Sequence, residues 1–162
     1  MTINSICICG AGTMGSGIAQ VVAQSGFFTL LYELNPVILQ KAKADIEKKL
    51  QSLVEKGKMT AGEKDKTLQR IQFTGDIQSC LADVFIEAII ESPAIKVALF
   101  NQLAELNHSE CIFATNTSSL SVTAIATKIK NPERVIGMHF FNPAPVMKLV
   151  EVINTNYTNE QT

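Results

Sequence analysis

The feature that most constrains this chain is a glycine-rich segment directly after an apolar run at residues 6–9. The segment reads Gly10-Ala11-Gly12-Thr13-Met14-Gly15, a G-x-G-x-x-G pattern between a predicted strand and a predicted helix. In such a pattern the first glycine permits a tight turn, the second lets backbone approach a ligand, and the third lets the helix pack close to the strand. The free N–H groups and positive end of the helix favour a pyrophosphate, so the pattern predicts a dinucleotide site.

An acidic residue lies at the spacing that such a site requires. Glu33 closes the next apolar run, residues 28–32, and stands 23 positions after the first glycine. A carboxylate there accepts hydrogen bonds from the adenosine ribose hydroxyls and repels a 2′-phosphate, which favours NAD over NADP. The alternative is that the glycines form an ordinary turn and Glu33 merely ends a strand in solvent.

Composition limits the class of protein. The chain has 162 residues, 46% of them hydrophobic and 18% charged, and a net charge of −1. This predicts one globular domain with no global field for nucleic acid or anionic lipid. No apolar run is long enough for a membrane span, and the first residues do not resemble a signal peptide, so we expect a cytoplasmic protein. The four cysteines fit a reduced compartment, and with only two histidines and no CxxC spacing we expect no metal site.

Apolar runs alternate with helical patterns, which predicts βαβ units and an α/β fold with a parallel sheet. The predicted strands are residues 6–9, 28–32, 71–74, 84–89, 111–115, 134–139 and 149–153. The predicted helices besides the hairpin described next are residues 13–25, 93–106 and a short segment after Ser121.

One helical pattern is longer than a sheet crossover needs. Asn35-Pro36 supplies an N-cap and a proline at the first helical position, and apolar residues then recur at helical spacing to about residue 56. Residues 60–63 form a capping box that opens a second helix. We therefore predict a helical hairpin over about residues 36–71, inserted in a single domain of residues 1–162 and protruding from the sheet.

A histidine and a glutamate are candidates for proton transfer. His139 ends a predicted strand at the edge where the glycine loop lies, and a histidine beside a nicotinamide ring can remove a hydroxyl proton. Glu151 lies twelve positions later in an apolar strand, where a buried acid needs a partner, so we expect it to bind the other ring nitrogen of His139. A hydrogen-bonded core histidine and an outward-facing glutamate remain equally open from the chemistry alone.

Three further groups have both a structural and a functional interpretation. Residues 116–120 follow a strand at the same edge and either satisfy a turn or hydrogen-bond a substrate oxygen. Glu91 and Lys96 either form a surface charge pair or belong to the site. Lysines crowd one end of the hairpin, where they form a solvated face or receive nucleotide phosphates, namely Lys48, Lys49, Lys56 and Lys58.

Five segments, in order, resemble the NAD-binding domain of L-3-hydroxyacyl-CoA dehydrogenases, the family that includes the 3-hydroxybutyryl-CoA dehydrogenases. They are residues 10–20, 87–91, 116–120, 138–143 and 148–153, and the resemblance covers nearly the whole chain. It implies a doubly wound, Rossmann-type α/β fold with a mostly parallel sheet. It also implies NAD as cofactor and the reversible oxidation of the 3-hydroxyl of an acyl-CoA to a ketone in fatty acid metabolism.

The resemblance also implies roles for individual residues. His139 would be the catalytic base, Glu151 its orienting partner, and Ser118 a contact to both the substrate oxygen and the cofactor. The nicotinamide half of NAD would lie near Glu91, Lys96 and Asn142, and coenzyme A would be held by Lys49 and Lys56.

The chain departs from the family pattern in two ways. Glu33 stands where aspartate is more common, but the longer side chain still suits a ribose. The family also has a second, all-helical domain that completes the pocket and forms a homodimer, and nothing here matches it. We therefore expect an excised domain with little or no activity alone. The alternatives are a non-catalytic NAD-binding module, a piece of a multifunctional fatty-acid oxidation protein, and a hydroxyacid dehydrogenase with a lysine base, which would need a lysine in place of His139.

Overall fold

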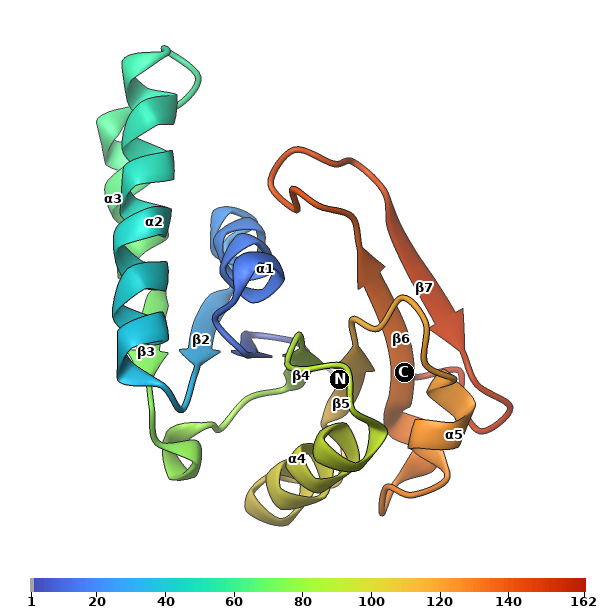
Figure 1. Cartoon of the computed structure of the whole chain (residues 1–162). Helices are drawn as coiled ribbons and strands as arrows, with labels where there is room; N and C mark the ends of the chain where they lie inside the picture. Colours follow the sequence, from blue (N-terminus) through green and yellow to red (C-terminus); the bar gives the residue numbers. More distant parts are fainter. Residues whose placement is uncertain (1) are drawn as a thin grey trace.

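The computed structural model describes residues 2–162 around one seven-stranded sheet of order β3-β2-β1-β4-β5-β6-β7 (Figure 1). The strands are β1 Ser5–Cys9, β2 Phe28–Tyr32, β3 Ile71–Thr74, β4 Val84–Glu87, β5 Ile112–Thr115, β6 Val135–Phe140 and β7 Val150–Asn154. All neighbouring strands pair in parallel except β6 and β7, which pair antiparallel. The strand order reverses between β1 and β4, so the predicted doubly wound, mostly parallel sheet is confirmed.

Helices cover both faces of the sheet (Figure 1). The helices are α1 Thr13–Gln24, α2 Pro36–Glu55, α3 Ala61–Gln69, α4 Pro93–Leu106 and α5 Val122–Ala126, with short 3-10 helices at Ile77–Ser79 and Pro132–Arg134. One core lies between the sheet and α1 with α2, where Ile8, Ile18 and Ile46 are fully buried. A second lies between the sheet and α4 with α5, where the rings of Phe85 and Phe113 stack with centroids 5.4 Å apart. Parallel strands buried on both faces account for the continuous apolar runs in the sequence.

The predicted helical hairpin consists of α2 and α3 and extends past the sheet beside β3 (Figure 1). The Asn35 side chain accepts hydrogen bonds from the backbone N–H groups of Val37 and Ile38, so the predicted N-cap is present. Thr60 and Glu63 form the capping box of α3 in both directions. Gly57 turns the chain between the helices with φ of +65°, a conformation that favours glycine.

The last strand differs from the sequence-based expectation. All residues of β7 are exposed, including Glu151, which was expected to be buried within this apolar strand. As an edge strand, β7 pairs only with β6, so its apolar side chains, such as Val152 and Ile153, remain uncovered. Within residues 2–162 no helix has both the length and the apolar character needed to span a membrane.

Candidate functional site

The glycine loop joins β1 to α1 at the carboxyl edge of the sheet. Gly10 has φ of +99°, and a Cβ there would lie 2.8 Å from the Ala88 carbonyl oxygen, while a Cβ at Gly15 would overlap the Gly10 carbonyl oxygen. A Cβ at Gly12 would meet no atom within 4 Å. Gly12 is also the N-cap of α1 and gives the helix no side-chain cap. Two glycines are therefore required by packing, and the third leaves open space over uncapped N–H groups, which suits a pyrophosphate.

Glu33 follows β2 and lies beside this loop. Its Oε2 accepts a hydrogen bond from the Ala11 N–H at 3.1 Å, and its Oε1 accepts one from the Asn35 N–H at 3.0 Å. Both oxygens are thus fixed by backbone. The carboxylate lines a pocket of about 520 Å³ whose walls are largely apolar, including Leu34, Ile38 and Ile95. A fixed carboxylate in an apolar pocket next to the glycine loop has the chemistry of an adenosine site.

A second pocket, of about 440 Å³, shares Ala88 and Ile89 with the first. It lies toward β5 and β6, beyond the position between β1 and β4 where the strand order reverses. It collects most of the remaining candidate residues from the sequence, namely Met14, Glu91, Lys96, Ser118, His139 and Asn142. Thr13 lies outside both pockets and lines a smaller one beside Gly12 and Lys41. The two larger pockets therefore meet at Ala88 and Ile89, and residues of the glycine loop line both of them.

His139 and Glu151 stand opposite each other on β6 and β7. The distance from His139 Nδ1 to Glu151 Oε2 is 2.8 Å, so the structure brings the expected pair together. The reason given from the sequence was wrong, because the Glu151 side chain is 52% exposed and not buried. The antiparallel register, and not a need to offset burial, sets the contact. With Nδ1 bound to the carboxylate, Nε2 is the ring nitrogen left for a ligand.

Lys96 is not a surface residue, which corrects one of the two interpretations of Glu91 and Lys96. Its side chain is 1% exposed, and Nζ lies 2.7 Å from Glu87 and 3.0 Å from Glu91. Glu91 is partly exposed and also accepts a hydrogen bond from the Thr117 hydroxyl. Burial raises the pKa of the Glu91 carboxyl, but the hydrogen bonds from Thr117 and Lys96 and the Lys96 charge outweigh it and hold the pKa below its ordinary value.

Comparison with known proteins agrees with this geometry. The sequence model of the family described as "3-hydroxyacyl-CoA dehydrogenase, NAD binding domain" matches residues 5–162. The chain belongs to this family. Its cofactor is accordingly NAD. A 3-hydroxyadipyl-CoA dehydrogenase of Escherichia coli is 48% identical over 95% of the chain and 33% of its own length. A probable 3-hydroxybutyryl-CoA dehydrogenase of Deinococcus radiodurans is 47% identical over 96% of the chain and 56% of its length.

Solved structures show the same relationship. The crystal structure of a 3-hydroxybutyryl-CoA dehydrogenase from Escherichia coli superposes with a TM-score of 0.96 at 47% identity, over 99% of this chain and 34% of the other. The chain thus spans between about a third and just over half the length of these relatives. In extent and fold it corresponds to the NAD-binding domain of the family.

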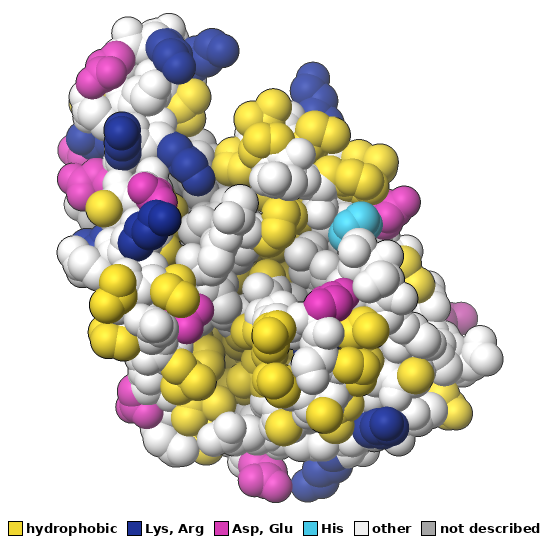
Figure 2. Space-filling model, viewed as in Figure 1, with side chains coloured by type: hydrophobic (Ala, Val, Ile, Leu, Met, Phe, Trp, Pro, Cys, Tyr) yellow, Lys and Arg dark blue, Asp and Glu magenta, His cyan; other side chains and the backbone are white. Residues whose placement is uncertain are grey.

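Two lysines of the hairpin line a third pocket. Lys49 and Lys56 line a space of about 330 Å³ together with Pro143, Pro145 and Val146 of the connection between β6 and β7. Figure 2 shows Lys and Arg side chains over the hairpin and a cleft between it and an apolar patch. The two predicted lysines therefore line the same pocket, which has no lining residue in common with the pocket that contains His139.

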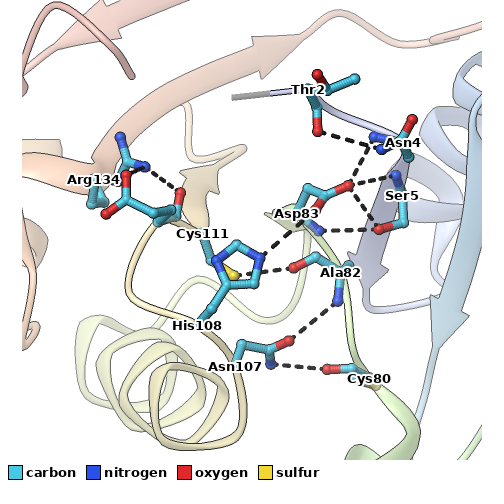
Figure 3. Close-up of polar contacts among 11 residues, drawn as sticks. Thr2, Asn4, Ser5, Cys80, Ala82, Asp83, Asn107, His108, Cys111 and Arg134 are labelled. Carbon is cyan, nitrogen blue, oxygen red and sulfur yellow. Dashed lines mark hydrogen bonds and ion pairs between the residues drawn. The ribbon is translucent and has the colours of Figure 1, made fainter.

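A polar cluster lies at the opposite, amino edge of the sheet (Figure 3). The Asp83 carboxylate accepts hydrogen bonds from the Asn4 N–H, the Ser5 N–H and the Ser5 hydroxyl, and His108 Nε2 lies 3.7 Å away. Burial raises the pKa of Asp83, but these hydrogen bonds and the neighbouring His108 outweigh it and lower the pKa below its ordinary value. The cluster fastens the start of β1 to β4 and has no pocket residue in common with the cofactor site.

Sequence reasoning missed Glu87 and Thr115, which contact each other behind the second pocket. Glu87 is fully buried at the end of β4, and it accepts a hydrogen bond from the Thr115 hydroxyl on the neighbouring strand β5. A signal was present, because Lys96 lies in the first turn of α4, where the positive end of the helix disfavours a cation. Among residues 2–162 no three His, Cys, Asp or Glu side chains gather as metal ligands.

Proposed function

We propose that this chain is the cofactor-binding part of an enzyme that oxidises the 3-hydroxyl of an L-3-hydroxyacyl-CoA to a 3-ketoacyl-CoA, reversibly and with NAD. The observation that carries the proposal is the 2.8 Å contact between Glu151 and His139, because His139 lines a pocket together with Ser118. A non-catalytic NAD-binding module would bind the cofactor equally well but has no need of this pair.

Residues of the chain fit NAD along its whole length. The glycine loop and the uncapped N-terminus of α1 suit the pyrophosphate, and Glu33 suits the adenosine ribose. The nicotinamide half then falls in the second pocket, near Glu91, Lys96, Ser118 and Asn142. When bound there, NAD supplies the hydride acceptor for the reacting carbon.

The side chains around this pocket have different roles in the transfer of the substrate's hydroxyl proton. Glu151 holds His139 at Nδ1, so that Nε2 is free to take the proton of the substrate hydroxyl. The carboxylate also stabilises the imidazolium that results. Ser118 is exposed in the same pocket, and we assign its hydroxyl to a hydrogen bond with the substrate oxygen. Asn116 fixes this loop against β6, because its Oδ1 accepts a hydrogen bond from the Phe140 N–H at 2.8 Å.

Lys49 and Lys56 are assigned to the phosphates of coenzyme A. Both are exposed, and they border the pocket between the hairpin and residues 143–146. The apolar side chains exposed on and before β7, such as Leu149 and Val152, suit a protein surface that covers them. We propose that the covering surface belongs to the part of the longer relatives that the chain does not span. We assign dimerisation and the far wall of the substrate pocket to the same part.

The first experiment is a fluorescence titration of the 162-residue chain with NADH and with NADPH. Because the Glu33 carboxylate repels a 2′-phosphate, NADH should bind at least about tenfold more tightly. Glu33→Gln should narrow this ratio, whereas Glu47→Gln, an exposed acid on α2, should not. Equal affinities for the two cofactors in the unaltered chain would overturn the assignment of Glu33 and with it the choice of NAD.

A further inference from the structure

Lys96 has been assigned to the nicotinamide half of NAD, but its buried ion pair with Glu87 has been given no role so far. The Glu87 side chain is 0% exposed, and both of its oxygens lie 2.7 Å from Lys96 Nζ. Glu87 also accepts hydrogen bonds from the Thr115 hydroxyl and the Ile89 N–H. Buried pairs of this kind contribute little net stability compared with apolar residues of similar volume, so their presence calls for another explanation.

The pair has a consequence for the charge of the second pocket. A lysine ammonium has three donors, and Lys96 directs them to the two oxygens of Glu87 and to Glu91 Oε2 at 3.0 Å. Two carboxylates therefore share one ammonium, and the cluster carries a net charge of about −1 when both are ionised. Glu91 lies on the pocket side and is 42% exposed, while Glu87 lies behind it and is sealed from solvent.

We propose that Glu87 sets the charge of the nicotinamide pocket: because Glu87 and Glu91 share the single ammonium of Lys96, the cluster keeps a net negative charge beside the pocket, and this charge binds oxidised nicotinamide more tightly than reduced nicotinamide. The reason is that the ring carries a positive charge only in the oxidised cofactor. The inference rests on the proposed function, because that function places the nicotinamide in this pocket. Glu87 cannot touch the cofactor, so it acts only through Lys96 and through the electric field.

The test compares the affinities of NAD⁺ and NADH in Glu87→Gln, with NADH measured by fluorescence and NAD⁺ by competition. The amide keeps an acceptor for Lys96 but removes one negative charge. The ratio of the NAD⁺ to the NADH dissociation constant should rise roughly fourfold, the effect of one charge about 10 Å away at an effective dielectric constant of about 40. Glu105→Gln, the same change at an exposed position on α4, should leave the ratio unchanged.

A purely structural role predicts a different result. If Glu87→Gln weakens NAD⁺ and NADH by the same factor, the charge argument is wrong. If the variant does not fold, two further variants replace it: Glu87→Gln with Lys96→Gln keeps the net cluster charge near −1, and adding Glu91→Gln removes that charge. Only the triple variant should show a raised ratio of the NAD⁺ to the NADH dissociation constant. Equal ratios in the double and triple variants would overturn the proposal. If the unaltered chain binds neither cofactor, the proposed function itself fails, and this inference fails with it.

Discussion

Replacing Gly12 by alanine should lower the affinity for NADH without lowering the stability of the fold. A Cβ at Gly12 would meet no atom within 4 Å, and its backbone, at φ −67° and ψ −167°, is open to any residue. Alanine is a poorer N-cap than glycine, but it also restricts the unfolded chain, and the two effects offset to within about 1 kcal/mol. The variant should therefore fold with nearly unchanged thermal stability.

Binding should respond quite differently. The added methyl group would occupy the space over the first turn of α1, where no side chain caps the N–H groups. A hydrogen bond to a charged oxygen contributes about 1.5–3 kcal/mol, so loss of one lowers NADH affinity by roughly 10- to 150-fold. Fluorescence titration of NADH and thermal unfolding measure the two effects on the same sample.

The matched control is Gly62→Ala in α3, where a Cβ would also meet nothing within 4 Å. It should leave NADH affinity unchanged. If Gly12→Ala folds and binds NADH as the unaltered chain does, the pyrophosphate does not lie over the glycine loop.

The remaining predictions concern the proposed proton-transfer pair, the part of the relatives that the chain does not span, and the amino edge of the sheet. In a protein that joins this chain to the remaining length of its relatives, His139→Ala should lower kcat by about 10²–10⁴-fold, and adding Glu151→Gln should lower it little further; losses that multiply would show that the two residues act separately. The chain alone should reduce acetoacetyl-CoA very slowly or not at all, and full activity would refute the proposed need for the additional length of its relatives. The depressed pKa of Asp83 stabilises the fold above about pH 4, and this contribution is lost as pH falls through the folded pKa. Asp83→Asn should therefore lower the free energy of unfolding by about 1–2 kcal/mol at pH 7 and flatten its fall below about pH 4 in urea titrations; parallel pH curves would contradict this.

Local signals predicted most of the fold. The N-cap at Asn35, the capping box at Thr60 and the apolar runs each depend on residues close together in sequence, and all are present in the structure. The direction of β7 was not predicted, because alternation of side chains is the same for either direction. The length of the connection could have shown it, since residues 141–149 are too few for a parallel crossover of a dozen or more residues.

The site was harder to predict, because its contacts join distant elements. His139 and Glu151 were paired for the wrong reason, burial, whereas strand register brings them together. Lys96 was weighed as a surface residue because its partner Glu87 lies on a strand and faces it only once α4 packs on the sheet. Pairing across the fold, and not residue type, determines which charges are buried.

Because β7 is an edge strand, the contact between His139 and Glu151 depends on the register of a single strand pair. Glu151 faces His139 only because five consecutive residues of β7 align with β6, and no element on the other side of β7 within residues 2–162 holds it there. A slip by two residues would keep the strand and its exposed faces but set an apolar side chain, Leu149 or Ile153, against the imidazole. An insertion or deletion of two residues inside β7 would therefore leave a chain that still folds and still binds nucleotide, yet has lost the carboxylate that we propose positions His139. In this family such a chain would offer a short route from an enzyme to a nucleotide-binding protein.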